Sequence, residues 1–185
     1  LKCFDVPGQL LQTKETLSLA METLLKELYA QNVLTVEVRF APQLHKRNGL
    51  TGEEIVESVL EGQERALAQC EGMKAGTILC MMVNGETSEN METVELAKKY
   101  LGKGVVCLDI AGPEGMIPMM GFKVFFDMAK KLDVPYIIHA GECGSAENVN
   151  IALDLGAIRI GHGIAAIKDE AVLKRLVDTQ TPIEV

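Results

Sequence analysis

The chain has 185 residues, of which 48% are hydrophobic and 24% charged, as expected for a globular protein with one substantial core. Its formal net charge of −8, with no basic run, argues against nucleic acid as a partner. No apolar stretch approaches the roughly 18 residues of a membrane span, so we expect no membrane partner. The five cysteines form no CxxC pair, and Cys80 and Cys107 lie in apolar, strand-like runs, which predicts buried thiols in a cytoplasmic protein.

The first part of the chain alternates between helical and strand patterns. A stripe of leucines at helical spacing predicts a helix over residues 10–31, and strict alternation predicts a strand over residues 33–40. Thr51 and Glu54 form a capping-box pattern at the start of a second helix. We expect the polar loop before that helix to leave His45 in solvent.

The rest of the chain continues the alternation. The expected strands cover residues 75–83, 105–110, 134–138 and 157–160, and a last strand begins at Pro182. The expected helices cover residues 88–102, with Ser88 or Asn90 as the cap, and then 118–132, 145–155 and 168–177.

Such alternation is typical of a parallel α/β fold with right-handed crossovers. A doubly wound sheet and a (β/α)8 barrel of the TIM type both satisfy it. Polar residues at the ends of several strands favour the barrel, whose strand ends surround one pocket, and no GxGxxG pattern supports dinucleotide binding. Because a barrel takes about 250 residues, we expect residues 1–185 to be a single catalytic-domain fragment, the middle of the barrel with about six of eight units and both flanks missing.

Two of the three histidines, His139 and His162, end consecutive predicted strands, and Glu142 follows the first by three residues. A lone His139 would most simply be a core histidine, but this grouping favours chemistry, since imidazole binds zinc and a carboxyl group transfers protons. A catalytic zinc takes about three protein ligands, for which the candidates here are His139, His162 and Asp109. Gly112, after the strand over 105–110, is either a turn glycine or a place where the backbone approaches a ligand.

Five strand-end segments carry a more specific signal through their order. They are VEVRFAP at residues 36–42, ILC at 78–80, LDIAGPE at 108–114, HAGECGS at 139–145 and RIGHG at 159–163. Together they resemble the motifs of the adenosine deaminase family. The members of this family are zinc hydrolases of the amidohydrolase superfamily. The resemblance implies a barrel enzyme with a Zn²⁺ cofactor that hydrolyses adenosine or deoxyadenosine, its small-molecule purine nucleoside partner, to inosine and ammonia in purine salvage.

The resemblance also implies a role for each matching residue. His139 would bind zinc, and Glu142 would donate a proton to purine N1. His162 would orient or deprotonate the water that attacks C6, rather than bind the metal, and Gly112 would offer its backbone amide to the purine. Because Glu142 must carry a proton to donate one, we expect its side chain to be buried.

The chain departs from the family pattern in two respects. The family's H-x-H motif and its aspartate pair, which supply further zinc ligands, do not occur in these 185 residues. Pro113 stands where the family often has aspartate. Adenine, AMP and N6-substituted AMP therefore remain alternative substrates, and a non-catalytic fragment remains an alternative to an enzyme.

Overall fold

The computed structural model describes residues 5–143 and 145–185. The chain divides into two compact units, the first made of residues up to 79 together with 95–106, and the second of residues 80–94 and 107–185. No helix within the described ranges is long and apolar enough to cross a bilayer.

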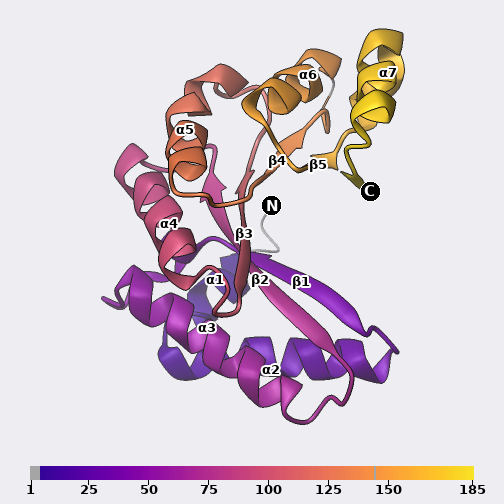
Figure 1. Cartoon of the computed structure of the whole chain (residues 1–185). Coiled ribbons are helices and arrows are strands. Elements are labelled where there is room, and N and C mark those ends of the chain that lie inside the picture. Colours follow the sequence, from indigo (N-terminus) through magenta and orange to yellow (C-terminus); the bar gives the residue numbers. More distant parts are fainter. Residues whose placement is uncertain (1–4, 144) are drawn as a thin grey trace. The chain divides into compact units, whose positions relative to one another are not determined.

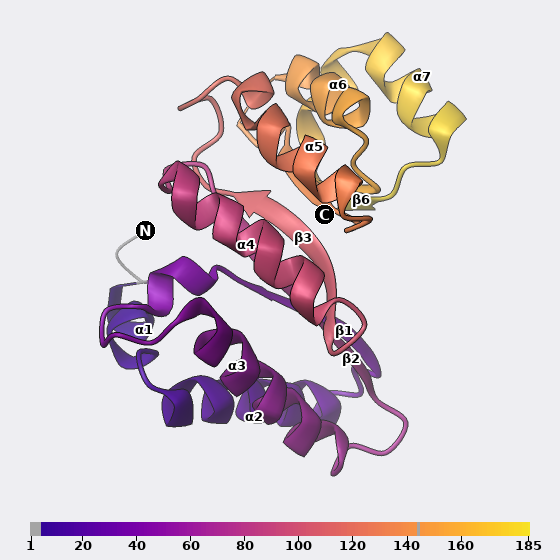
Figure 2. The same cartoon turned by 60° about the vertical axis from the view of Figure 1, so that its left-hand side comes forward.

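The first unit packs two long helices against a pair of parallel strands (Figure 2). The strands pair in a register that runs from Val36 opposite Ala75 to Phe40 opposite Leu79. Val36, Val38 and Phe40 alternate along the first strand and pack together against the apolar side chains of the helices, as a period of two predicts. The elements are α1 (Asp5–Leu10), α2 (Lys14–Ala30), β1 (Thr35–Phe40), η2 (Pro42–His45), α3 (Gly52–Leu67) and the first part of β2 (Lys74–Met82).

The single helix predicted over residues 10–31 is wrong, because the chain forms α1 and α2 with a break before Lys14. The Thr13 hydroxyl accepts the Thr16 N–H at 3.2 Å, so a local cap replaces the continuation of the helix. The capping box predicted at the start of α3 is confirmed. Thr51 Oγ1 accepts the Glu54 N–H at 3.2 Å, and Glu54 Oε2 accepts the Thr51 N–H at 3.0 Å.

His45, which we expected in solvent, is buried with an exposed fraction of 9%. Its Nδ1 donates to the Leu11 carbonyl at 2.7 Å, and its ring lies 5.8 Å from that of Phe40. Burial lowers the pKa of His45, and the charge of Arg47 acts in the same direction. The prediction failed because the residues that cover His45 include Leu11, 34 positions earlier in the chain.

The second unit is also built from parallel strands, with helices beside them (Figure 1). Ile138 pairs with Ile160, Gly161 pairs with Glu184, and an isolated parallel bridge joins Leu108 to Tyr136. The elements that lie wholly or mainly here are β3 (Val105–Ala111), η3 (Met119–Phe122), α5 (Lys123–Lys131), β4 (Ile137–Ala140), α6 (Ala146–Leu155), β5 (Arg159–His162), η4 (Ile164–Lys168), α7 (Glu170–Thr179) and β6 (Ile183–Glu184), while α4 (Thr87–Tyr100) is shared between the units.

Several helix boundaries in this part of the chain differ from the prediction. The helix expected over residues 118–132 opens as the 3-10 turn η3, in keeping with the poor helix propensity of Gly121. The helix expected from residue 88 begins at Thr87, so neither Ser88 nor Asn90 caps it. The Asn90 side chain instead bonds the N–H and the carbonyl of Met82, each at 2.9 Å, and so holds the end of β2. The helix expected from residue 168 starts after its N-cap, Asp169.

The predicted fold class is confirmed as α/β with parallel strands, since the described strands pair in parallel and alternate with helices. The strands β4 and β5 extend two residues further than expected and end in Ala140 and His162. The thiols of Cys80 and Cys107 are buried, as predicted.

Candidate active site

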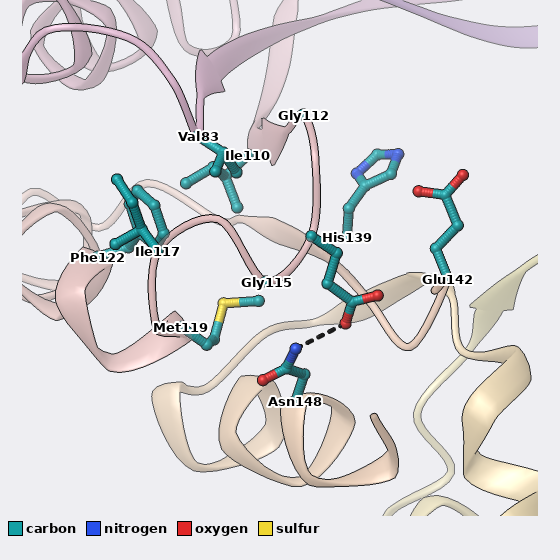
Figure 3. Close-up of a pocket in the computed structure, with 11 residues that line it drawn as sticks. Val83, Ile110, Gly112, Gly115, Ile117, Met119, Phe122, His139, Glu142 and Asn148 are labelled. Atoms are coloured by element: carbon teal, nitrogen blue, oxygen red, sulfur yellow. Dashed lines mark hydrogen bonds between the residues drawn. The ribbon is translucent and has the colours of Figure 1, made fainter. Parts of the chain in front are cut away.

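Polar side chains from β3, β4, β5 and the loop after β4 lie at the carboxyl ends of these strands in the second unit, and Figure 3 draws His139 and Glu142 among them. They include His139 and Glu142, which line a cavity of about 20 Å³, room for roughly one water molecule. One wall of the cavity is apolar and is formed by Val83, Ile110, Ile117, Met119 and Phe122. The carboxyl ends of parallel strands are the usual place for a site in such folds.

The His139 ring is held by a buried carboxylate. Asp109, which has no exposed surface, lies with its Oδ1 at 3.0 Å from His139 Nδ1, and the same oxygen accepts the Ile110 N–H at 2.7 Å. Because a carboxylate only accepts hydrogen bonds, Nδ1 is the nitrogen that donates, and in the neutral ring Nε2 then carries the lone pair. In this tautomer histidine binds a metal through Nε2. Asp109, a candidate ligand on sequence grounds, therefore orients the ring.

Gly161 is required where His139 packs. A Cβ at this position would lie 2.9 Å from His139 Cγ, closer than non-bonded carbon atoms approach. Gly161 pairs with His139 across β4 and β5. The glycine within the RIGHG segment thus makes room for the imidazole on the neighbouring strand.

His162 and Glu142 complete the group. His162 Nε2 lies 3.7 Å from Glu142 Oε2, and the rings of His139 and His162 are 5.1 Å apart at an angle of 67°. His162 has a φ of +65°, a left-handed conformation that costs a non-glycine residue about 1 kcal/mol or more and is concentrated at functional sites. The three predicted residues therefore come together in space.

The burial expected of Glu142 is not found, because 48% of its side chain is exposed. Glu142 stands in the loop after β4, which turns at Gly141 with a φ of +72°. Nothing in the described ranges covers this carboxyl group enough to bury it.

Gly112 lines the same cavity and has a φ of +131°. A Cβ there would meet Val83 Cβ at 3.1 Å, so both the backbone angle and the available space favour glycine. The two interpretations of Gly112 are thus compatible: it is a turn glycine, and it brings bare backbone to the cavity.

Glu114 is a residue of this site that motif-based reasoning did not single out. Its Oε1 accepts the Gly141 N–H at 2.7 Å and Asn148 Nδ2 at 2.8 Å, and its Oε2 accepts the Cys143 N–H at 2.8 Å (Figure 3 draws the bond to Asn148). Burial alone would raise the pKa of Glu114, but these hydrogen bonds together lower it below its usual value. The available signal was its position at the end of the LDIAGPE segment.

The described residues can supply one ligand of a zinc site, His139, but not the complete set of ligands. His139 presents the correct tautomer, yet no group of three or more His, Cys, Asp or Glu in residues 5–143 and 145–185 is placed to hold a metal. Catalytic zinc sites use about three protein ligands. Any further ligands must come from outside this part of the chain.

Comparison with known proteins identifies the family of the chain. A sequence model of the family described as adenosine deaminase matches residues 1–185. The chain belongs to the adenosine deaminase family. An adenosine deaminase from Haemophilus ducreyi is 46% identical over all of this chain. The chain spans 55% of that relative's length, about half of the curated protein.

Solved structures show the same fold for this adenosine deaminase family chain. The N6-methyl-AMP deaminase of Arabidopsis thaliana matches all of it with a TM-score of 0.88 at 24% identity, over 56% of that protein. Adenine deaminase from Arthrobacter aurescens matches 93% of it with a TM-score of 0.78 at 26% identity, over 52% of that protein. An amidohydrolase from Burkholderia ambifaria, solved with bound Zn, matches 93% of it with a TM-score of 0.86 at 20% identity, over 48% of that protein.

Proposed function

We propose that this chain forms part of the catalytic (β/α)8 barrel domain of a zinc-dependent enzyme that hydrolyses adenosine, or deoxyadenosine, to inosine and ammonia. The observation that carries the proposal is the meeting of His139, Glu142 and His162 at the ends of two paired strands in a member of the adenosine deaminase family. The cavity of about 20 Å³ is too small for a nucleoside, so these residues form one wall of a larger site.

His139, held by Asp109, is the zinc ligand of this wall. A bound zinc ion supplies Lewis acidity and makes water a competent nucleophile near neutral pH. His162, whose Nε2 faces the Glu142 carboxyl group, orients the attacking water and takes up its proton. Glu142 donates a proton to purine N1, which makes C6 more electrophilic.

The residues that line the cavity suit a nucleoside better than a nucleotide. Among the described residues that line the cavity none is Lys or Arg, and the Glu114 carboxylate, whose pKa its hydrogen bonds lower, would repel a phosphate. The apolar side chains of the cavity suit a purine face, and the bare backbone of Gly112 would bond a ring nitrogen. N6-substituted AMP is the second candidate substrate, because an N6-methyl-AMP deaminase shares the fold. A cytoplasmic location, and the absence of nucleic-acid and membrane partners, remain predictions from sequence.

The test is an assay of the full-length protein with Zn²⁺, which follows the loss of adenosine absorbance, with AMP and N6-methyl-AMP in parallel. We expect adenosine to be deaminated fastest and Glu142→Gln to lower kcat by about 10²–10⁴-fold, the usual contribution of a general acid. Glu147→Gln, an exposed carboxylate in the first turn of α6, is the matched control and should keep its activity.

Two outcomes would contradict the proposal. A zinc-loaded protein that deaminates none of these purines would support a non-catalytic role. Unchanged turnover in Glu142→Gln would remove the proton donor assigned above.

A further inference from the structure

We propose that Glu114 is a positioning residue that fixes the loop of residues 141–143 and thereby places the carboxyl group of Glu142. This inference rests on the proposed function, since it concerns the proton donor of that reaction. Glu114 follows β3, whereas the loop follows β4. The hydrogen bond from the Gly141 N–H to Glu114 joins residues 27 positions apart in the sequence.

The contacts of Glu114 bracket Glu142 on both sides. The Gly141 N–H and the Cys143 N–H, one residue before and one after, donate to different oxygens of the same carboxylate at 2.7 and 2.8 Å. The backbone around Glu142 is thus held at two points by one rigid planar group. The Glu142 side chain remains exposed to the cavity side of the loop, available to a substrate.

The loop has need of such a partner. Backbone N–H groups beyond a strand end have no ladder carbonyl to bond, and leaving that of the buried Gly141 unpaired would be costly. Ser145, the N-cap of α6, makes no side-chain capping bond to tie the loop to the helix. The third bond of Glu114, from Asn148 in the first turn of α6, supplies this link.

A carboxylate suits the role better than a neutral side chain. It offers two acceptor oxygens, and bonds from N–H groups to an ionised acceptor are about twice as strong as neutral ones. The lowered pKa of Glu114 agrees with a group that is ionised at neutral pH. Glutamine at this position would keep the volume but lose one acceptor, so one of the two loop amides would lose its partner.

The experiment is a double-mutant cycle in the zinc-loaded, full-length protein. We expect Glu114→Gln to lower kcat for adenosine by about 10–100-fold with a smaller change in KM, because a misplacement near 1 Å costs up to about 100-fold. Zinc content and melting temperature should stay near the wild-type values. If Glu114 acts through Glu142, the double variant should be no slower than Glu142→Gln alone.

A second measurement does not depend on turnover. Amide hydrogen exchange in a peptide covering residues 139–148 should be faster in Glu114→Gln and unchanged in the control Glu147→Gln. If Glu114→Gln does not fold, Glu114→Asp takes its place in the cycle, since it keeps the charge but withdraws the oxygens by one methylene.

The outcomes separate this inference from the function on which it rests. Wild-type kcat and wild-type exchange in Glu114→Gln would overturn the positioning role, as would losses that multiply in the double variant. Failure of the wild-type protein to deaminate adenosine, or full activity of Glu142→Gln, would instead overturn the proposed function, and the exchange measurement would still decide whether Glu114 holds the loop.

Discussion

In the first unit, the side chains that β1 packs against α2 and α3 are apolar, and charged side chains of the helices form ion pairs such as those of Lys14 with Glu54 and of Arg65 with Glu22. In the second unit, β3, β4 and β5 carry Asp109, His139 and His162 at or near their carboxyl ends. The same strand–helix pattern therefore meets two demands. In the first unit, substitutions should act on stability, and in the second, strand-end substitutions should act on chemistry.

The largest effect expected in the first unit follows from one leucine of α2. Leu25 has no exposed surface and belongs to the core cluster, so Leu25→Ala should lower the free energy of unfolding by about 2–5 kcal/mol. Leu19→Ala makes the same chemical change on the same helix where 61% of the side chain is exposed, and should stay within about 0.5 kcal/mol of wild type. Denaturant titration of the full-length protein measures both.

The kcat of the protein that remains folded should be unchanged in both variants. Equal losses of stability in Leu25→Ala and Leu19→Ala would show that Leu25 does not belong to the core of the first unit. A lower kcat in folded Leu25→Ala would break the division between the two units.

The next effect belongs to the second unit. Asp109→Asn keeps the shape of the side chain but removes the charge that holds His139 in its metal-binding tautomer, so zinc affinity should fall by about 10–100-fold. Competition with a chelator measures the affinity directly. Asp133→Asn, an exposed change of the same kind, is the control. An unchanged zinc affinity in Asp109→Asn would mean that Asp109 does not orient the ligand.

The residues of this pair also show what the sequence can predict. His139, Glu142 and His162 were predicted because each stands in a local motif at a strand end. The bond between Asp109 and His139 joins residues 30 positions apart, and it exists because β3 and β4 bring the two together. Periodicity identified the strands, but no local sequence pattern predicts that the His139 ring faces the Asp109 carboxylate.

Helix boundaries show a similar division. The capping box at Thr51 was predicted correctly because all of its atoms lie within four residues. The break before Lys14 and the 3-10 turn at Met119 were missed, since an apolar stripe continues through each. Glu114 and the buried His45 were missed for the same reason as the Asp109 bond, because their partners are distant in the chain.

A smaller effect on stability should come from the cap of α3. Thr51→Ala removes the oxygen that accepts the Glu54 N–H and should cost about 1 kcal/mol, whereas Thr51→Ser keeps this oxygen and should retain most of the stability. Thermal unfolding of the two variants gives the difference. The kcat of the folded protein should not change, because the cap lies in the first unit; a change would again break the division.

The smallest effect concerns an ion pair that joins α2 to α3. The bond from Lys26, together with that from Arg65 on α3, lowers the pKa of Glu22 to about 2 from an ordinary value of 4.5. Because the folded-state pKa is the lower one, the stabilisation is fully present above about pH 4.5 and is lost as the pH falls through about 2. Glu22→Gln should therefore be less stable than wild type at pH 7, and the difference should shrink between pH 4.5 and 2.

Urea unfolding at pH 7, 4.5, 3 and 2 measures this difference, with Glu27→Gln, an exposed carboxylate on the same helix, as the control at pH 7. Added salt should narrow the gap between Glu22→Gln and wild type, because the pair is close to solvent. A deficit in Glu22→Gln that is the same at pH 7 and pH 2 would mean that packing, and not the charge of Glu22, joins the two helices. The charges of the first unit would then contribute little even to stability, and its contrast with the charges at the strand ends of the second unit would become sharper.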